Sequence, residues 1–371
     1  MTDNCYAVVA AGGTLGHVTP GLAVARELVE RGHSVDSIHF VGSSRGVECE
    51  VVPEAGFALT LLPGRGVQRR FTLENIGAVL GILKGILQAI ALFRRLRPKV
   101  VLTTGGYASV ACVTAAVLWR VPVVVAESNA VAGAANRAAG RFAKASAVAF
   151  ASAQLKNQTV TGNPVRAEML TMARSGEPSR QQDAQAAIGA EGQGPLLGVF
   201  GGSLGARRIN QAVLEVAADR PALRVHHVVG HRDWSLFESE MARAKVANPN
   251  YRAVEFEHHM ERVLAASDLV LSRSGASSVA EISALGVPSI LVPLPIAAAD
   301  HQTANALALT DVGAARLLPD ANLNASQLGA LLDELLADDI ALQNMAKAAS
   351  SIAHLDAASR VADLVEECAK Q

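Results

Sequence analysis

Two glycine-rich turns hold the residues of this sequence that are best suited to chemistry. The first, AAGGTLGH, spans residues 10–17, and the second, FGGSLGAR, spans residues 200–207. Each follows a hydrophobic run and opens a helical pattern, so free backbone N–H groups and the positive end of the helix dipole can bind a phosphate. Glycines at such junctions can instead serve close strand–helix packing. Because TTGGYAS (103–109) is a third turn of this kind, phosphate binding is favoured.

The first turn has His17 where the second has Ala206. Imidazole titrates near neutral pH and often acts as a general base, so His17 is a candidate base at the mouth of the turn. The alternative is a histidine that only caps or packs locally.

A further helix start lies in RSGASSVAE (273–281), with Glu281 one turn inside the pattern. A carboxylate there can accept hydrogen bonds from the two vicinal hydroxyls of a ribose, while neighbouring amides face a phosphate or a base. An acid that only stabilises the helix is the alternative. The following DHQTAN (300–305) adds amide and imidazole groups suited to sugar hydroxyls, which favours the binding role.

Short β-branched runs alternate with helical patterns throughout the chain, which is typical of parallel sheets covered by helices on both faces. We therefore expect an α/β protein with two doubly wound domains, residues 1–163 and 164–351. The first and second glycine turns open equivalent junctions, which fits an ancient duplication. Ligands bind outside the carboxyl ends of the strands in such sheets, so the active site is expected in the cleft between the domains.

Several classes of protein are disfavoured. A dehydrogenase would need G-x-G-x-x-G and an acid at the end of the second β-run, and this sequence has neither. The four scattered cysteines lack metal-ligand spacing and indicate free thiols in a reducing cytoplasm. The N-terminus has no basic stretch ahead of the first β-run, so no secretory signal is expected.

The net charge of −1 hides an asymmetry between the two halves. Residues 1–163 contain 16 Lys and Arg against 9 Asp and Glu, whereas residues 164–371 contain 17 against 25. This asymmetry suggests an anionic partner for the first half only, unless surface charge has merely drifted.

Residues 64–99 combine an apolar helical pattern with cations on both flanks. These cations are Arg65, Arg69, Arg70, Arg94, Arg95, Arg97 and Lys99. A core helix of the first sheet and a peripheral patch for anionic lipid headgroups both stay open, one for each face of the helix. A membrane-spanning helix is disfavoured because Lys84 and Gln88 interrupt the apolar run.

Taken in order, the motifs resemble those of the MurG family of bacterial glycosyltransferases. They are GGTLGHVTPGLAVA, TTGGYASV, ESNAVAGAANR, TGNPVR, GGSLGARRIN, RSGASSVAEISALGVPSILVPLP and DHQTANA. The resemblance runs from about residue 6 to beyond residue 305. It implies a GT-B type fold, in which two Rossmann-like domains face each other and the C-terminal helix, about 352–371, packs back on the first domain.

The implied reaction is an inverting transfer of N-acetylglucosamine from UDP-N-acetylglucosamine to a lipid. The acceptor is the 4-hydroxyl of the muramyl sugar of undecaprenyl-pyrophosphoryl-MurNAc-pentapeptide, so lipid I becomes lipid II in peptidoglycan biosynthesis. The alternatives are an enzyme like UDP-N-acetylglucosamine 2-epimerase and a non-catalytic, membrane-associated nucleotide-sugar-binding subunit.

The resemblance also implies roles for individual residues, with His17 as the candidate base. The donor residues are Thr14, Leu15, Gly16, Asn129, Arg166, Ser203, Glu257, Ala276, Ser277, Ser278, Val279, Ala280, Glu281 and Gln302. Arg166 and Ser203 would hold the diphosphate and Glu281 the ribose, while Gln302 would bind sugar hydroxyls. The acceptor pyrophosphate is expected at Gly13, Gly105, Gly106 and Tyr107.

No cofactor and no metal are expected, because amides, a helix dipole and Arg166 would stabilise departing UDP and the chain contains no D-x-D. The expected partners are UDP-N-acetylglucosamine, the undecaprenyl-linked muramyl-pentapeptide and an anionic membrane surface through residues 64–99, with no nucleic acid. Such a protein would be peripheral, on the cytoplasmic side of the plasma membrane.

Four positions or segments depart from the family pattern. Leu15 stands where a glycine is usual, and Ala126 and Ser128 stand where His and Gln are common. The segment FEHHM (256–260) replaces a run such as FIDDM, which would matter less if the backbone of Glu257 contacts the uracil.

Overall fold

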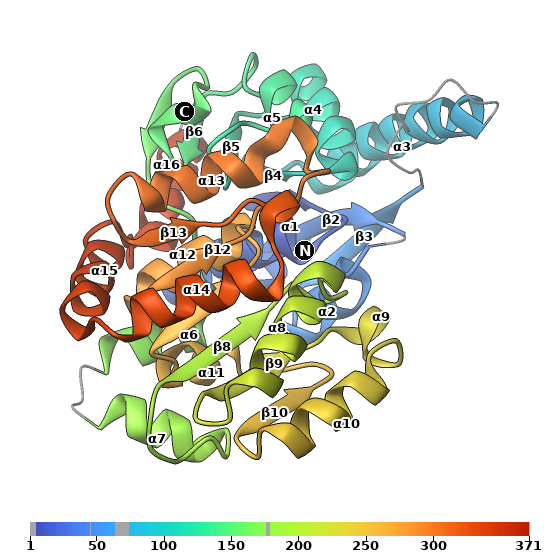
Figure 1. Ribbon diagram of the computed structural model, residues 1–371. Helices are drawn as coiled ribbons and strands as arrows, with labels where there is room; N and C mark the ends of the chain where they lie inside the picture. Colours follow the sequence, from blue (N-terminus) through green and yellow to red (C-terminus); the bar gives the residue numbers. More distant parts are fainter. Residues whose placement is uncertain (1–4, 45, 64–73, 176–178, 371) are drawn as a thin grey trace. The chain divides into compact units, whose positions relative to one another are not determined.

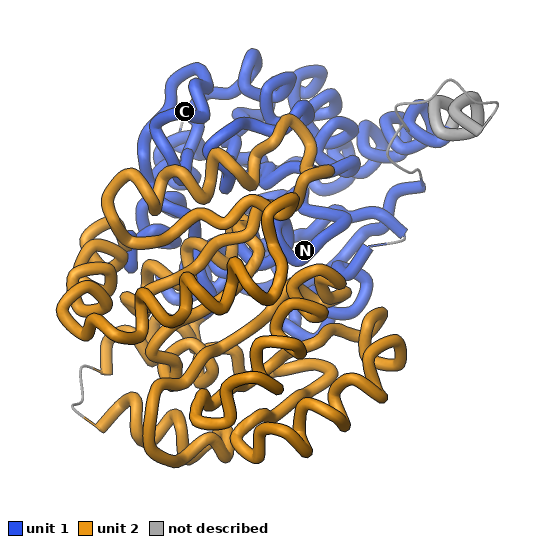
Figure 2. The backbone as a smooth tube through the Cα atoms, viewed as in Figure 1, with its two compact units in different colours: residues 1–166, 354–371 blue, residues 167–353 orange. Residues whose placement is uncertain are grey.

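The computed structural model divides the chain into two compact units, shown in Figures 1 and 2. Unit 1 comprises residues 1–166 and 354–371, and unit 2 comprises residues 167–353. The residues that the structure describes are 5–44, 46–63, 74–175 and 179–370. Each unit is built on one parallel sheet with helices on both faces, which confirms the predicted pair of doubly wound domains.

In the described residues, the sheet of unit 1 has seven parallel strands in the order β3-β2-β1-β4-β5-β6-β7. They are β1 (Ala7–Ala11), β2 (Ile38–Ser43), β3 (Ala58–Leu62), β4 (Val100–Gly105), β5 (Val123–Glu127), β6 (Ala145–Val148) and β7 (Gln158–Val160). Alternate side chains enter opposite cores, as the pleat requires: Val8 faces one core and Val9 the other.

Helices cover both faces of this sheet. They are α1 (Leu15–Glu30), α2 (Glu48–Glu54), α3 (Glu74–Leu96), α4 (Tyr107–Trp119), α5 (Ala134–Ala139) and α16 (Ala357–Ala369). Buried side chains of α1, α2 and α16 form the core on one face, and those of α3, α4 and α5 form the core on the other.

In the described part of unit 2, the sheet has six parallel strands in the order β10-β9-β8-β11-β12-β13. They are β8 (Leu196–Phe200), β9 (Arg224–Val228), β10 (Tyr251–Val254), β11 (Leu269–Ser272), β12 (Ser289–Leu291) and β13 (Ala315–Leu317). The helices are α6 (Ala167–Arg174), α7 (Arg180–Ala187), α8 (Arg207–Asp219), α9 (His231–Trp234), α10 (Glu238–Ala247), α11 (Met260–Ala266), α12 (Ala276–Leu285), α13 (His301–Thr310), α14 (Ala325–Leu336) and α15 (Asp339–Ser351).

Both sheets have a topological switch point beside their first strand. In unit 1, β1 lies between β2 and β4, and in unit 2, β8 lies between β9 and β11. The loops that follow the two strands at a switch point diverge and leave a crevice at the carboxyl edge of the sheet, where such folds bind ligands. The three predicted glycine turns and the RSGASS helix start lie on these four loops.

The C-terminal helix α16 belongs to unit 1 and packs on α1. Val361 and Val365 are fully buried in the core that also holds Val24 and Leu28 of α1. Polar groups at the end of α1 extend the contact. Arg31 Nη1 lies 3.0 Å from Glu366 Oε2, and the same guanidinium group also donates hydrogen bonds to Asp363 and Ser359. The helix is therefore fixed by apolar burial and by a charged cluster at one end.

Acid is expected to weaken this cluster through Glu366. The hydrogen bond from His33, at 2.9 Å, is the main reason that the pKa of Glu366 lies below its ordinary value of 4.5, and Arg31 adds to the shift. A carboxyl whose pKa is lower in the folded state stabilises the protein fully above its unfolded pKa, and loses that contribution as the pH falls through the folded pKa. Wild-type unit 1 should therefore lose about 1 kcal/mol more stability than Glu366→Gln between pH 6 and pH 3.

Urea unfolding at several pH values measures this difference. Each unit contains one tryptophan, Trp119 in unit 1 and Trp234 in unit 2, so Trp234→Phe leaves a reporter for unit 1 alone. The neighbouring exposed Glu367→Gln serves as the charge-matched control and should keep the wild-type pH dependence. Equal pH dependence in the Glu366→Gln and wild-type proteins would contradict the assignment.

Helix α3 has a buried face and an exposed face. Ala89, Leu92 and Phe93 are buried in the core of unit 1, which confirms the core-helix interpretation of this segment. On the other face, Leu83 and Leu87 are 52% and 68% exposed. In the described part of the chain, no helix combines the length and apolar character needed to cross a membrane. The predicted basic positions Arg65, Arg69 and Arg70 lie outside the described residues.

Candidate functional site

The loop between β1 and α1 forms the first part of the site. Helix α1 begins at Leu15, so His17 lies in the first helical turn. Thr14 is the N-cap, but its side chain makes no capping bond, and both Thr14 and Leu15 are exposed. The N–H groups of Leu15 and Gly16 have no acceptor within the helix, as at any helix start, and are available to an anion.

His17 is half-buried and held by the backbone of its own loop. Its Nδ1 lies 3.2 Å from the carbonyl oxygen of Gly12. A carbonyl oxygen can only accept, so in the neutral ring Nδ1 carries the hydrogen and Nε2 has the free lone pair. Nε2 lies beside Gly105, where an added Cβ would come within 3.2 Å of it. The geometry suits a proton acceptor at the switch point.

Glu48, which the sequence interpretation did not single out, lies beneath this loop. Its fully buried carboxylate accepts from Gly13 N at 3.0 Å, from Ser43 N at 2.6 Å and from Ser43 Oγ at 2.8 Å. Gly13 has a φ of +96°, which favours glycine, and its N–H points inward to Glu48. The N–H of Gly13 is thus already used, and a pyrophosphate at this loop would depend on the amides that open α1.

The turn after β4 adjoins the loop after β1. Gly106 has a φ of +86°, and a Cβ there would collide with the Gly12 carbonyl oxygen, so only glycine lets the two loops approach this closely. The hydroxyl of Tyr107 lies 2.7 Å from Pro63 O and 3.0 Å from Gly81 O. Tyr107 therefore directs its hydroxyl to α3 and the segment before it, whereas Gly105 and Gly106 lie at the switch point.

A second buried carboxylate, Glu127, holds the loop after β5. It accepts from the backbone and side-chain nitrogens of Asn129 at 2.9 and 3.0 Å, from Gly133 N at 2.9 Å and from Asn136 Nδ2 at 2.9 Å. Asn136 also approaches Gly105, whose added Cβ would lie 3.5 Å from its Nδ2. Its Oδ1 is buried and has no hydrogen-bond partner among the described residues. Glu127 and Asn136 thus join Asn129 to the site, although the sequence interpretation named only Asn129.

The positions that depart from the family pattern near this loop are buried in unit 1. Ala126 is 5% exposed, and Ser128 is 6% exposed and donates from Oγ to Asn163 Oδ1 at 2.8 Å. Their side chains therefore contribute to packing within the unit.

In unit 2, the loop after β8 carries Ser203 at its exposed tip. The Ser203 carbonyl oxygen accepts from His231 N at 3.2 Å. A Cβ on Gly230 would collide with the backbone of Gly205, and one on Gly205 would collide with the carbonyl oxygen of Val229. Arg166, the other residue predicted at the diphosphate, is half-buried and is the last residue of unit 1 before α6.

The loop after β11 leads into α12, which carries a buried acid, Glu281, one turn inside the helix. Gly275 is the N-cap and provides no side-chain cap. Ser277 and Ser278 are half-buried in the first turn, whereas Ala276, Val279 and Glu281 are buried and Ala280 is half-buried. The Ser277 hydroxyl oxygen is buried without a hydrogen-bond partner among the described residues.

Gln302 is tied to this helix start from α13. Ser274 Oγ donates to Gln302 O at 2.8 Å, and Leu294 N donates to Gln302 Oε1 at 3.0 Å. The bond from Leu294 fixes which end of the Gln302 amide is the acceptor, so its NH2 group is oriented as a donor.

Glu257, the residue predicted near the uracil, is held through its side chain. Its Oε1 accepts from His259 N at 2.8 Å, and its Oε2 lies 3.7 Å from Nε2 of the buried His226. Burial lowers the pKa of His226 to about 4, against the raising effect of Glu257, so this histidine is neutral at physiological pH. A ligand at Glu257 would therefore meet its backbone more readily than its carboxylate.

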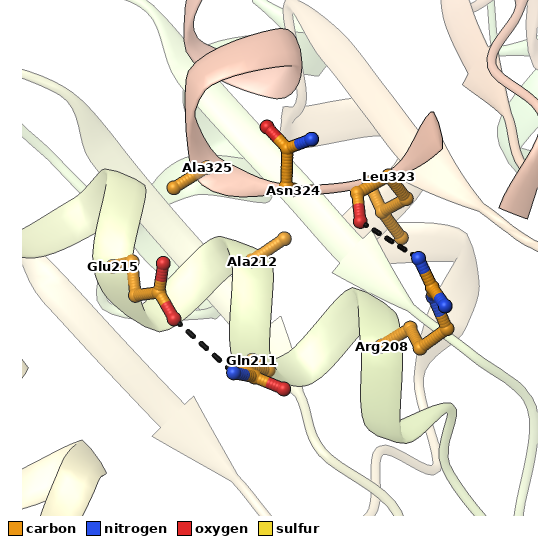
Figure 3. Close-up of a pocket in the computed structure, with 7 residues that line it drawn as sticks. All are labelled: Arg208, Gln211, Ala212, Glu215, Leu323, Asn324 and Ala325. Atoms are coloured by element: carbon orange, nitrogen blue, oxygen red, sulfur yellow. Dashed lines mark hydrogen bonds between the residues drawn. The ribbon is translucent and has the colours of Figure 1, made fainter. Parts of the chain in front are cut away.

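Figure 3 shows a pocket of about 290 Å³ elsewhere in unit 2, between α8 and the start of α14. Its cation, Arg208, donates to Leu323 O at 3.2 Å, and Gln211 Nε2 donates to Glu215 Oε1 at 3.3 Å. None of the predicted site residues lines it. Of the predicted residues, Thr14 to His17, Gly105 and Gly106 lie at the switch point of unit 1, and Ser203 and the first turn of α12 lie at that of unit 2. Asn129, Arg166 and Glu257 follow other strands, β5, β7 and β10.

Comparisons with known proteins identify two family domains along the chain. Residues 7–148 match the glycosyltransferase family 28 N-terminal domain, and residues 196–367 match the glycosyltransferase family 28 C-terminal domain. The UDP-N-acetylglucosamine–N-acetylmuramyl-(pentapeptide) pyrophosphoryl-undecaprenol N-acetylglucosamine transferase of Desulforudis audaxviator is 36% identical over 98% of both chains.

Two solved structures are also similar. The crystal structure of Acinetobacter baumannii MurG has a TM-score of 0.77 and 27% identity over 98% of this chain and 99% of that one. A UDP-GlcNAc 2-epimerase from Neisseria meningitidis has a TM-score of 0.69 over 97% of this chain and 100% of its own, but only 14% identity, so it shares the fold alone. The predicted GT-B fold class is thus supported by whole-chain likeness.

Proposed function

Since this chain belongs to the MurG family within glycosyltransferase family 28, we propose that it transfers N-acetylglucosamine from UDP-N-acetylglucosamine to undecaprenyl-pyrophosphoryl-MurNAc-pentapeptide. The observation that carries the proposal is His17, whose Nε2 lone pair lies beside Gly105 at the switch point of unit 1. A proton acceptor in that place is what an attacking hydroxyl requires.

The chemical step is an inverting displacement. The 4-hydroxyl oxygen of the muramyl sugar forms a bond to the anomeric carbon as the bond from that carbon to UDP breaks. The hydroxyl proton passes to Nε2 of His17, and UDP leaves with the electron pair as an anion. Amides of the helix starts, the helix dipole and Arg166 stabilise that anion.

In this proposal the donor is held by residues of unit 2 together with Arg166, the last residue of unit 1 before α6. Ser203 and Arg166 hold the diphosphate, the first turn of α12 faces the nucleotide, and Glu281 accepts from the ribose hydroxyls. Gln302 donates from its oriented NH2 group to the sugar, and the backbone at Glu257 contacts the uracil. The donor set thus combines a helix start with a buried acid.

The acceptor occupies unit 1. Its pyrophosphate lies at the amides that open α1 and at Gly105 and Gly106, while Thr14 and Asn129 reach the transferred sugar. Residues 1–163 form the acceptor and membrane-facing domain, and residues 164–351 the donor domain.

A radiolabel transfer assay from UDP-N-acetylglucosamine to a muramyl-pyrophosphoryl lipid, with and without chelator, tests the function. We expect transfer in both conditions and only slow hydrolysis when the lipid is omitted. Release of UDP at full rate from donor alone would favour an epimerase-like enzyme. Binding of UDP with no transfer in any condition would favour a nucleotide-sugar-binding subunit.

We also propose that unit 1 attaches peripherally to the cytoplasmic face of the membrane through α3 and α4. Exposed apolar side chains gather on these two helices, with Leu118 61% and Trp119 45% exposed on α4 beside Leu83 and Leu87 on α3. Trp119 Nε1 donates to Ile90 O at 3.1 Å, which joins the end of α4 to α3. The exposed cations Lys84, Arg94, Arg95 and Arg120 lie on or next to the same helices.

Vesicle binding should therefore grow with anionic lipid and fall with salt. Leu83→Ser with Leu87→Ser should weaken binding by about tenfold or more, because two leucine side chains no longer enter the lipid interface.

In Trp234→Phe protein, the fluorescence of Trp119 should shift to shorter wavelength on binding. Val246→Ser, which removes an apolar side chain that is 85% exposed in unit 2, is the control and should bind as wild type. Binding that ignores lipid charge and salt would contradict the proposal.

A further inference from the structure

The carboxylate of Glu48 and the imidazole of His17 bind the two ends of one peptide group. The N–H of Gly13 lies 3.0 Å from Glu48 Oε2, and the carbonyl oxygen of Gly12 lies 3.2 Å from His17 Nδ1. This N–H and this carbonyl belong to the same peptide bond, which is planar and holds them pointing in opposite directions. Carboxylate, peptide and imidazole therefore form a continuous hydrogen-bonded chain.

The surroundings of Glu48 are built for its carboxylate. It is fully buried, and both oxygens are engaged, since Oε1 accepts from the N–H and the hydroxyl of Ser43. Glycines enclose it: a Cβ on Gly12 would lie 2.7 Å from Oε1, and one on Gly42 or Gly46 would collide with the side chain. The position of the carboxylate is thus fixed from several sides.

The chain of bonds has a consequence for His17. A negative charge that accepts from the peptide N–H polarises the group and makes its carbonyl oxygen a stronger acceptor. A strong acceptor at Nδ1 favours the tautomer with the hydrogen on Nδ1 and the lone pair on Nε2. A carboxylate bonded directly to a catalytic histidine sets the tautomer in the same way.

We propose that Glu48 is a positioning residue that fixes the tautomer and orientation of His17 through the Gly12–Gly13 peptide group. The inference rests on the proposed role of His17 as the base, and it adds the group that holds this base in the tautomer able to accept a proton at Nε2. Glu48 itself touches neither substrate.

The first measurement is the tautomer of His17, which does not depend on activity. In ¹⁵N spectra of the full-length protein at neutral to mildly alkaline pH, the resonance absent from His17→Ala identifies this ring. Wild-type protein should show a protonated Nδ1 and an unprotonated Nε2. In Glu48→Gln a substantial share of the Nε2–H tautomer should appear, and an unchanged spectrum would overturn the proposal.

The second measurement is the split between kcat and KM. Glu48→Gln should lower kcat by about 10- to 100-fold and change the KM for UDP-N-acetylglucosamine by less than about threefold, because Ser203, Glu257 and the first turn of α12, which are proposed to hold the nucleotide, lie in unit 2. The matched control is Glu50→Gln, an exposed carboxylate on the same helix, which should have wild-type kinetics. Ser43→Ala removes a bond to Oε1 but keeps the bond to Gly13, so it should retain the wild-type tautomer.

The third measurement is a double-mutant cycle with His17→Ala. If Glu48 acts through His17, Glu48→Gln should cause little further loss in the His17→Ala background. An equal further loss would mean that Glu48 only supports the fold, and would overturn the proposal. If Glu48→Gln folds poorly, Glu48→Asp withdraws the carboxylate without removing its charge and should give the same tautomer change. Full activity of His17→Ala would instead refute the base assignment, while the spectra would still report on Glu48.

Discussion

Replacement of His17 by alanine is expected to lower kcat for transfer by about 10²- to 10⁴-fold, which is the usual contribution of a general base. UDP affinity should change by less than about threefold, because the proposed donor residues of unit 2 are untouched. Single-turnover transfer with radiolabelled donor, together with calorimetric titration of UDP, measures the two effects separately. Turnover within threefold of wild type at every pH would remove His17 from the role.

A second substitution separates a base from a histidine that only packs in its loop. His17→Asn keeps an N–H donor that can reach the Gly12 carbonyl oxygen, but an amide nitrogen accepts no proton at neutral pH. If His17 is the base, His17→Asn should be about as slow as His17→Ala. If the ring only holds the loop, the asparagine variant should recover most of the turnover. His39→Gln, at a histidine bonded to Thr60 between β2 and β3, controls for loss of an imidazole from unit 1.

Several edge strands of the two sheets give only a weak signal in the sequence. β3, β7 and β13 are edge strands, and their sequences ALTLL, QTV and ARL are short or partly polar. A central parallel strand is buried on both faces and reads as a continuous apolar run, whereas an edge strand is partly exposed and gives no such signal. The central strands and their glycine turns, which set the switch points, were therefore the predictable part of the fold.

The buried acids of unit 1 mark the limit of sequence reasoning about the site. Glu48 accepts hydrogen bonds from the backbone of Ser43, a few residues earlier in the sequence, and of Gly13, a whole strand crossover earlier. Glu127 accepts from the backbone of Gly133, a few residues later. Tertiary packing determines these hydrogen-bond partners, and the local spacing of residues in the sequence does not indicate them. The available signal was weak. Glu127 ends a strand that is otherwise apolar, and Glu48 follows the mostly buried strand IHFVGS by five residues. An acid at such a position is buried only with hydrogen-bond partners.

The same limit applies to the direction of individual donor groups. The glycine turn places a helix start at α1, but its sequence does not indicate that the N–H of Gly13 turns inward to Glu48. Likewise, Tyr107 lies next to the predicted turn, yet its hydroxyl reaches Pro63 and Gly81. A sequence motif places a residue at a loop, whereas the direction of each donor depends on neighbours far along the chain.

Replacement of Glu281 is expected to have the largest effect on the affinity for the donor nucleotide. Glu281→Gln should raise the Kd for UDP by about 10- to 150-fold, because hydrogen bonds to a charged acceptor contribute about 1.5–3 kcal/mol. General electrostatics predicts the opposite sign: residues 164–371 contain 25 Asp and Glu against 17 Lys and Arg, so removing one acid should slightly favour an anionic ligand. A loss of affinity would therefore report a specific contact.

Two comparisons make that contact testable by titration of UDP. Glu334→Gln removes an exposed acid of unit 2 and should leave the affinity unchanged or slightly higher. A UDP analogue without the ribose 2′-hydroxyl should bind wild-type protein several-fold more weakly than UDP, whereas Glu281→Gln should bind both with similar affinity. If the variant still discriminates fully between the two nucleotides, the ribose is held by other groups. The buried acid would then act only on α12 itself, because a carboxylate near the N-terminus of a helix interacts favourably with the helix dipole.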